Sequence, residues 1–205
     1  DPVPNSVELA GESILITGSN MAGKTTFIKT VGINVVLART LGVCLAAKAG
    51  IPNLRVMSSI ERESVVEDRR SRHLAEIDRL HEFIRLGDAG DNCLFLVDEI
   101  FHGTNTLERI SSAAAVLRYL GTRASLLVTT HDLELAGELD GMFRMCHFSE
   151  MVEEDRFFFD YRLKPGPCNT RNAIRLLELE GYPQTIVSEA RNIARRLEQA
   201  GGQGI

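Results

Sequence analysis

A glycine-rich segment near the amino end of the chain has the residue types that bind phosphate. Residues 18–25 are Gly-Ser-Asn-Met-Ala-Gly-Lys-Thr, which fits the pattern G-x-x-x-x-G-K-[ST]. Such glycines let successive backbone N–H groups converge on phosphate oxygens, and the following helix adds its positive end. The segment therefore predicts an ATP site in which Lys24 contacts the β- and γ-phosphates and the Thr25 hydroxyl ligates Mg²⁺. The predicted ATP-binding residues here are Gly18, Ser19, Asn20, Met21, Ala22, Gly23, Lys24, Thr25 and Thr26.

Two acidic residues follow an apolar run in the middle of the chain. Residues 94–97 are Leu-Phe-Leu-Val, and Asp98 and Glu99 come directly after them. Ligands of open α/β sheets bind at the carboxyl ends of strands, so this pair is expected to face the glycine-rich segment. Asp98 is predicted to hold Mg²⁺ through water, and Glu99 to act as the general base on the attacking water. A strand that simply ends in a polar turn is the weaker alternative.

A third polar cluster follows the apolar run 126–128. It consists of Thr129, Thr130, His131 and Asp132. His131 is predicted to sense the γ-phosphate of ATP and to belong to the catalytic residues, since all three motifs would meet at one edge of the same sheet. The alternative is a histidine that only makes a structural hydrogen bond.

Short apolar runs alternate with helical patterns over the first two thirds of the chain. This alternation is typical of an α/β fold with a central, mostly parallel sheet flanked by helices. Strands are predicted at residues 13–16, 55–60, 93–97 and 126–129. Helices are predicted at residues 25–41, 71–87, 107–120 and 133–139, the second with Leu74, Ile77, His81 and Ile84 on one face.

The last third of the chain has a different pattern. Residues 142–148 and 156–163 are predicted to form a β-hairpin with an acidic tip at residues 153–155. Two helices are then predicted, capped by Thr170 and Thr185 and separated by Gly181-Tyr182-Pro183. The predicted domains are an ATPase core over residues 1–165, a helical appendage for dimerisation over residues 166–200, and a frayed tail over residues 201–205.

Composition limits the classes of function. The chain has 205 residues and a net charge of −5, which argues against binding nucleic acid by bulk charge. Its four cysteines are widely spaced, so reduced, mostly buried thiols and a cytoplasmic location are expected. No apolar run approaches the roughly 20 residues that span a bilayer, so no membrane partner is expected. The first residue, Asp1, indicates a piece of a longer parent chain.

Three segments closely resemble the ATPase domain of the MutS mismatch-repair family. Residues 17–26 (TGSNMAGKTT), 98–106 (DEIFHGTNT) and 129–131 (TTH) correspond to TGPNMGGKST, DEIGRGTST and ATH in the family. Val3-Pro4-Asn5 is similar to the family's VPND segment beside the adenine, which adds Val3 and Pro4 to the ATP-binding residues. The resemblance covers nearly the whole chain, and it implies a P-loop NTPase fold of the ABC-ATPase type with a C-terminal helix-turn-helix appendage that dimerises.

The resemblance also implies a homodimer in which two ATP-site faces, together with the C-terminal helices, meet and complete each other's sites. The family's trans element is a serine in a G-x-S-T-F-like segment, and Ser71 is its counterpart here. The glycine that normally precedes this serine is missing, and Arg70 or Arg72 could instead bring positive charge to the partner's γ-phosphate. A solvated, charged loop is an equally weighted alternative.

The function implied is ATP hydrolysis in mismatch repair or another form of DNA processing. DNA would be bound by domains of the longer parent, because the family's mismatch-reading, connector, lever and clamp parts have no counterpart in these residues. Met21-Ala22, Phe101-His102 and the altered segment around Ser71 favour a MutS-related protein without mismatch recognition. The main alternative is a nucleotide-gated dimerisation switch with negligible hydrolysis, against which Glu99 argues. An ABC transporter or chromosome-organising ATPase would carry an LSGGQ-like segment, and a small-molecule kinase would need a lid; neither is found.

Overall fold

The computed structural model describes residues 2–19, 21–60, 69–101, 105–153, 156–168 and 173–201. The chain divides into two compact units. One comprises Asp1–Phe148 and Tyr161–Cys168, and the other comprises Ser149–Asp160 and Asn169–Ile205. The boundary expected at residue 165 differs from this division in two respects: residues 166–168 group with the first unit, and residues 149–160 group with the second. The hairpin of the second unit, which precedes residue 165, groups with the C-terminal helices because one of its strands contacts a C-terminal helix.

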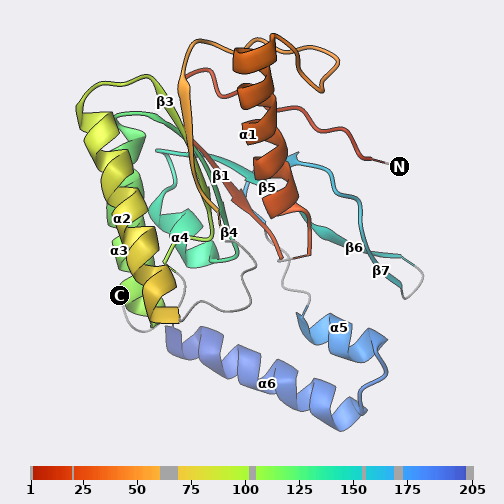
Figure 1. The fold of residues 1–205 in the computed structure, drawn as a ribbon. Helices are drawn as coiled ribbons and strands as arrows, with labels where there is room; N and C mark the ends of the chain where they lie inside the picture. Colours follow the sequence, from red (N-terminus) through yellow and green to blue (C-terminus); the bar gives the residue numbers. More distant parts are fainter. Residues whose placement is uncertain are drawn as a thin grey trace. The chain divides into compact units, whose positions relative to one another are not determined.

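A six-stranded sheet forms the centre of the first unit (Figure 1). Five neighbouring strands run parallel, and the sixth pairs antiparallel at the edge. Three of the inner strands are buried along almost their whole length, as expected for a parallel sheet with both faces covered. The predicted α/β class with a mostly parallel sheet is confirmed. In spatial order the strands are β2 (Arg55–Ser59), β3 (Cys93–Asp98), β4 (Ser125–Thr130), β1 (Ile14–Thr17), β5 (Arg144–His147) and β8 (Lys164–Pro165).

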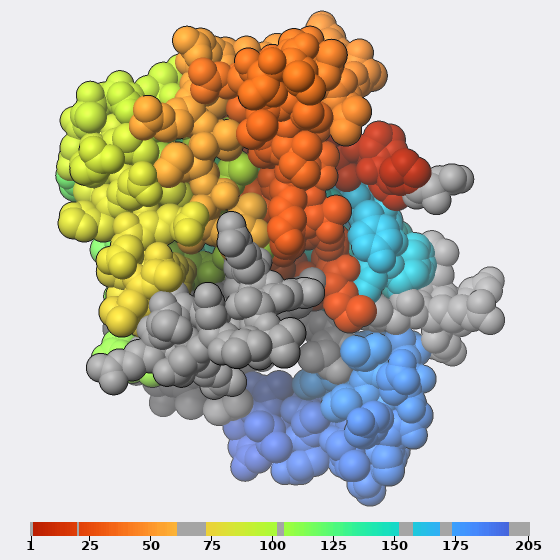
Figure 2. All heavy atoms as spheres, in the orientation of Figure 1, coloured from red at the N-terminus to blue at the C-terminus, as the bar shows by residue number. Residues whose placement is uncertain are grey.

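Four helices cover the two faces of this sheet (Figure 1). Helix α1 packs on one face, and the other three share a hydrophobic core on the opposite face. Strand residues alternate between the two cores, with Leu15, Phe95 and Val128 on the side of the three helices. The outer face of α1 is open to solvent on the side shown in Figure 2. The helices are α1 (Lys24–Leu41), α2 (Arg69–Asp88), α3 (Thr106–Gly121) and α4 (Leu133–Glu138).

Two glycines determine where α1 begins and how closely it approaches the sheet. Gly23 has a left-handed φ of 97° at the N-cap, which turns the chain from the glycine-rich segment into the helix. Gly32 lies where a Cβ atom would be only 2.6 Å from Cδ1 of Leu96 in β3. A side chain at position 32 would therefore require the Leu96 side chain to move or α1 to shift.

The predicted pairing of the strand at residues 142–148 is wrong. Residues 144–147 form β5, which pairs parallel with β1 and antiparallel with β8, and not with residues 156–159. The hairpin is made by β6 (Glu150–Glu153) and β7 (Arg156–Phe159), in the second unit. The cause is a main-chain partner far away in the sequence: Arg144 N–H donates to Ser13 O at 2.9 Å and Phe148 N–H to Thr17 O at 3.0 Å. Residues 154 and 155 of the expected acidic tip lie outside the described residues.

The helical pattern predicted after residue 71 is confirmed in α2, but the core uses a different face. Leu74 and Ile77 are exposed, whereas Leu80, Phe83 and Leu86 are buried. Phe83 stacks on Phe95 with ring centroids 4.5 Å apart, which fixes this face against β3.

The second unit contains the hairpin and two helices, α5 (Ala173–Leu179) and α6 (Gln184–Gly201), and α5 contacts both α6 and β7. Gly181, with φ of 74°, lies in the turn between the helices. Thr185 was expected to cap α6 but lies inside its first turn, and the carbonyl of Pro183 accepts from Ile186 and Val187 N–H instead. Thr170 lies outside the described residues, and Gly201, expected to be frayed, is the last residue of α6.

Two further sequence expectations concern cysteines and membranes. All four cysteines are free thiols; Cys93, Cys146 and Cys168 are buried, as predicted, and Cys44 is partly buried. Within the described part of the chain, no helix combines the length and the apolar character needed to cross a membrane.

Candidate functional site

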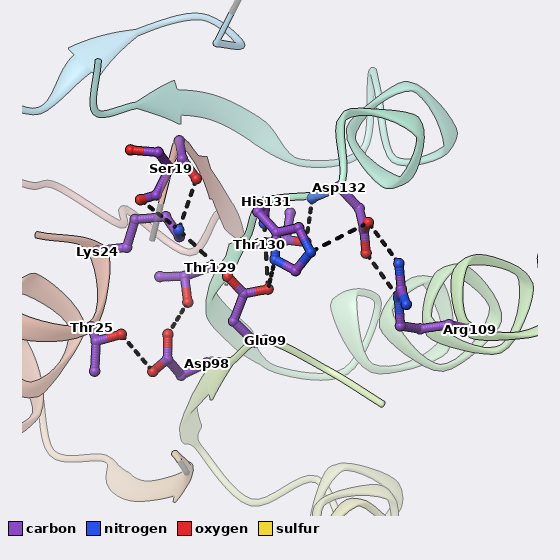
Figure 3. A network of polar contacts seen from close by, with 11 residues as sticks. Ser19, Lys24, Thr25, Asp98, Glu99, Arg109, Thr129, Thr130, His131 and Asp132 are labelled. Atoms are coloured by element: carbon purple, nitrogen blue, oxygen red, sulfur yellow. Dashed lines mark hydrogen bonds and ion pairs between the residues drawn. The ribbon is translucent and has the colours of Figure 1, made fainter. Parts of the chain in front are cut away.

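The three sequence motifs meet at the carboxyl ends of neighbouring strands β1, β3 and β4. A single network of polar contacts connects residues from all three (Figure 3). Lys24 begins α1 after β1, Asp98 is the last residue of β3, Glu99 follows it, and His131 follows β4. The parallel register of these strands places their ends side by side, as the sequence predicted.

Lys24 is almost completely buried beneath the glycine loop, which we define as residues 18–25. Its Nζ donates to the carbonyl oxygens of Gly18 at 2.7 Å and Ser19 at 3.0 Å, and lies 3.4 Å from Oε1 of Glu99. Only 3% of the lysine side chain is exposed. The buried ammonium is therefore stabilised by acceptors from the loop itself and by one carboxylate.

The shape of the glycine loop depends on close packing around its first glycine. Gly18 has φ of 141°, and a Cβ atom there would lie 2.4 Å from the carbonyl oxygen of Phe148. Ala22 is buried and Met21 is largely exposed, while Asn20 lies outside the described residues. Ser19 Oγ is buried and has no hydrogen-bond partner among the described residues. Ser19 thus carries a hydroxyl with no described partner, while its carbonyl oxygen accepts from the ammonium of Lys24.

Asp98 is held by two hydroxyl groups. Thr25 Oγ1 donates to Asp98 Oδ2 at 2.8 Å, and the hydroxyl of Thr129 donates to Oδ1. The carboxylate is buried, and these bonds satisfy one acceptor position on each oxygen. The two residues predicted to ligate Mg²⁺, Thr25 and Asp98, are therefore in direct contact.

Glu99 occupies a backbone conformation that is unusual for a residue with a side chain. Its φ is 54°, and its N–H donates to Thr129 O at 3.1 Å. Oε2 lies 2.7 Å from Nδ1 of His131. Because left-handed backbone is disfavoured outside glycine, its occurrence directly after β3 indicates that the direction of this carboxylate is constrained by the site.

The hydrogen bond to Glu99 is the main cause of a raised pKa for the imidazole of His131. Burial opposes this shift, while the negative charges of Glu99 and Asp132 add to it. The nearby ammonium of Lys24 acts in the opposite direction. The protonated imidazole is therefore favoured while His131 contacts the Glu99 carboxylate.

Two interactions near the site were missed in the sequence. Arg109 of α3 forms a bidentate ion pair with Asp132, with Nε to Oδ2 at 3.1 Å and Nη2 to Oδ1 at 2.9 Å. Glu76 of α2 accepts from Phe101 N–H at 2.6 Å, and Phe101 has a left-handed φ of 59°. The partners are more than 20 residues apart in each case, and no motif connects them.

Hydrogen bonds of Asn5 hold the N-terminal segment against residues 161–163, beside the glycine loop. Asn5 Nδ2 donates to Tyr161 O at 2.8 Å, and its Oδ1 accepts from Leu163 N–H at 2.7 Å. The ring of Tyr161 lies next to Gly23, where a Cβ atom would be 3.2 Å from Cδ1. Val3 and Pro4 are exposed near this attachment, and their contact with adenine remains a prediction.

The candidate trans residue is described only in its backbone. Ser71 lies in the first turn of α2, and the side chains of residues 69–72 lie outside the described part of the structure. Residues 102–104 also lie outside it. Contacts between two copies therefore stay a prediction.

The fold and the site together define an α/β protein with its polar site at the carboxyl edge of a mostly parallel sheet, between a glycine loop and a pair of acids. Residues 14–198 match the family model of MutS domain V. The chain belongs to the MutS family, as a C-terminal domain of that family.

Individual relatives agree with this assignment, and each carries the name DNA mismatch repair protein MutS. The protein from Geobacillus thermodenitrificans is 30% identical over 198 residues, covering 94% of this chain and 22% of the relative. The one from Thermus aquaticus is 28% identical over 197 residues, covering 95% and 24%. The one from Synechococcus sp. is 31% identical over 208 residues, covering 96% and 23%. The chain therefore spans less than a quarter of the length of these relatives.

Proposed function

We propose that this chain binds ATP with Mg²⁺ and hydrolyses it to ADP and phosphate. The observation that carries the proposal is the contact network in which Lys24 of the glycine loop pairs with Glu99 while Thr25 bonds to Asp98. In this proposal Lys24 binds phosphate, Thr25 and Asp98 hold magnesium and Glu99 is the general base, so the start of α1 and the end of β3 supply the site together. Membership of the MutS family supports the same proposal.

The glycine loop fits a phosphate group. The ammonium of Lys24 is held by the neutral carbonyl oxygens of Gly18 and Ser19, and anionic phosphate oxygens are stronger acceptors for it. The buried hydroxyl of Ser19 offers a further donor that has no described partner. Helix α1 starts at Lys24, so the positive end of its dipole favours an anion at the loop.

Thr25 and Asp98 fit a magnesium ion that is shared with a nucleotide. Both supply oxygen atoms, the ligand type that Mg²⁺ prefers. The described residues contain no group of three or more His, Cys, Asp or Glu side chains that could hold a metal alone. This agrees with an ion that takes its remaining ligands from water and phosphate. When bound, Mg²⁺ neutralises charge that develops on the phosphate oxygens.

Glu99 is the proposed base that takes a proton from the attacking water. In the arrangement observed, one oxygen faces Lys24 and the other contacts His131. Lys24 must therefore turn from Glu99 to the phosphates before Oε1 can accept the proton. His131 stays within hydrogen-bonding distance of Oε2 and orients the carboxylate.

We also propose that the chain acts as a homodimer with composite ATP sites, within a longer parent whose other domains bind DNA. Ser71 is the proposed trans residue. The apolar surface of α6 supports pairing through the C-terminal helices, since Ile186 and Ile193 are exposed on a shallow groove of about 370 Å³. A cytoplasmic location is part of this proposal.

The test is ATP turnover per chain as a function of protein concentration, with Lys24→Ala and Glu99→Gln as inactive variants. Turnover that rises with concentration and is lost in both variants supports a composite-site ATPase. Turnover that is independent of concentration would argue against composite sites. If the wild-type chain binds ATP but turns it over no faster than Glu99→Gln, the nucleotide-gated dimerisation switch is the correct function for this domain.

A further inference from the structure

We propose that Arg109 and Asp132 are positioning residues, which hold the imidazole of His131 and, through it, the carboxylate of Glu99. This inference rests on the proposed function for its consequence in catalysis. Neither residue belongs to the motifs that identify the glycine loop or its acid pair.

The geometry forms a chain of alternating charge (Figure 3). Arg109 holds both oxygens of Asp132, and Asp132 Oδ1 lies 3.8 Å from Nε2 of His131. On the other side of the ring, Nδ1 of His131 lies 2.7 Å from Glu99 Oε2. The imidazole is therefore placed between two carboxylates, one on each ring nitrogen.

The role of Asp132 is indicated by an interaction that it does not make. It occupies the N-cap of α4, where an aspartate ordinarily accepts a hydrogen bond from the first turn of the helix. Its side chain makes no such bond, and both oxygens are directed to Arg109 instead. Asp132 therefore forms an ion pair with Arg109 beside the site in place of the hydrogen bond that would cap α4. Local stabilisation of this kind is expected to be given up where function determines the geometry.

The pair is also sheltered from solvent. The side chains of Arg109 and Asp132 are 19% and 12% exposed, whereas those of the other α3–α4 pair, Arg118 and Glu138, are 48% and 54% exposed. The backbone of Arg109 is held in the first turn of α3, because its N–H donates to the carbonyl oxygen of the N-cap Asn105 at 3.0 Å. A planar guanidinium that grips both carboxylate oxygens restricts rotation of Asp132.

The consequence for His131 follows from these restraints. With Asp132 fixed, the ring keeps Nδ1 toward Glu99, and the carboxylate of Glu99 keeps its direction when Lys24 moves to a ligand. The charged groups that face His131 are Glu99 after β3, Asp132 at the start of α4 and Lys24 of α1. Loss of Arg109 leaves the first two in place but removes the restraint on their geometry.

The test compares Arg109→Gln, Arg109→Lys and Asp132→Asn with the control Arg118→Gln, which removes the exposed pair on the same two helices. Steady-state ATP hydrolysis gives kcat and KM for each variant. The ring-nitrogen resonances of His131, assigned with His131→Gln, are followed by NMR without nucleotide. Backbone amide spectra establish that each variant is folded.

We expect Arg109→Gln and Asp132→Asn to lower kcat by about 10-fold or more with little change in KM, because misplacing a catalytic group slows the chemical step. Arg109→Lys should recover part of this loss, and Arg118→Gln should match the wild type. The first two variants should also shift the His131 ring resonances, and Asp132→Asn should lower the pKa of His131. Unchanged His131 resonances in folded Arg109→Gln, or a rise in KM without a fall in kcat, would overturn the proposal.

The NMR readout separates this inference from the proposed function. If the wild-type chain hydrolyses no ATP, the proposed activity fails. Shifted His131 resonances in Arg109→Gln would still support the positioning of His131, and unshifted ones would overturn it.

Discussion

The ammonium of Lys24 lies 3.4 Å from Oε1 of Glu99, so the glycine loop after β1 and the acid after β3 are joined by an ion pair. Both side chains are largely shielded from solvent, at 3% and 14% exposure. An anionic ligand in the loop competes with Glu99 for the same ammonium. Binding of phosphate and release of the Glu99 carboxylate are therefore expected to occur together.

Replacing Lys24 is expected to weaken ATP binding strongly. Lys24→Ala should raise the dissociation constant about 10- to 100-fold, because a hydrogen bond to a charged group contributes roughly 1.5–3 kcal/mol. Isothermal titration calorimetry with ATP and Mg²⁺ measures this. The matched control is Lys29→Ala, which removes an exposed lysine of the same helix and should leave affinity unchanged. Equal affinities for the two variants would contradict the assignment.

Replacing Glu99 is expected to separate binding from turnover. Glu99→Gln should lower kcat by about 10²- to 10⁴-fold, as expected for loss of a general base. ATP affinity should be retained or increased, because a neutral glutamine forms no ion pair with Lys24 and does not repel the phosphates. Turnover and calorimetry on the same sample measure both quantities. Glu108→Gln, on the exposed surface of α3, serves as control; a loss of ATP binding in Glu99→Gln would refute this separation.

The contribution of His131 to stability should fall as the pH rises. The hydrogen bond to Glu99 raises the pKa of His131 in the folded chain, so protonated His131 stabilises the fold below its ordinary pKa of about 6.5. This stabilisation is lost as the pH rises through the raised pKa. It should amount to about 1 kcal/mol or less, since solvent screens a partly exposed pair. Urea unfolding of the wild type and His131→Gln at several pH values measures the difference, which should shrink toward alkaline pH and would be constant if the imidazole stays neutral.

The first glycine of the loop should not tolerate a side chain. Gly18→Ala places a Cβ atom 2.4 Å from the carbonyl oxygen of Phe148 at a φ of 141°, so strain of roughly 1–3 kcal/mol is expected from the backbone alone. Chemical denaturation measures the loss. Gly137→Ala in α4 is the control, because no atom lies within 4 Å of its Cβ position and alanine favours a helix by about 1 kcal/mol. Similar stabilities for the two variants would show that the loop relaxes freely.

Asn5 should stabilise the segment beside the glycine loop. Asn5→Ala removes three hydrogen bonds, to Tyr161 O, from Leu163 N–H and a longer one to Val3 O, and should cost about 1–3 kcal/mol. Asn5→Asp keeps the acceptor for Leu163 but loses the donor to Tyr161, so its unfolding free energy should lie between those of the wild type and Asn5→Ala. An Asn5→Ala variant as stable as the wild type would indicate that Tyr161 keeps its left-handed φ of 52° without this support.

The site could be predicted from the sequence where local pattern and sheet geometry agree. Asp98, Glu99 and His131 each follow an apolar run, and parallel strands place such residues at one edge. The pairing of Arg109 with Asp132 could not be predicted in this way, because it joins two helices over 23 residues and has no pattern of its own. The pair becomes evident only in the folded chain, where the start of α3 lies close to the start of α4.

The errors in the predicted fold also arise from contacts between residues that are far apart in the sequence. Residues 144–147 are compatible with either a hairpin or a parallel strand, and the choice depends on β1, which lies more than 120 residues earlier. In α2, Leu74 and Ile77 have the spacing of a buried face, but the sheet receives Phe83 because of its stacking with Phe95. Packing partners distant in sequence decided both cases.

Gly32 lies on the side of α1 that packs on β3, where a Cβ atom would be only 2.6 Å from Cδ1 of Leu96. Thr25 belongs to that helix and Asp98 to that strand, so the two halves of the proposed magnesium site are carried by the two elements that meet there. A methyl group at position 32 would require either the Leu96 side chain to move or α1 to shift, and a shift of α1 would change the distance between Thr25 and Asp98. The geometry of the proposed magnesium site is therefore expected to be sensitive to a core position that contributes no atom to it.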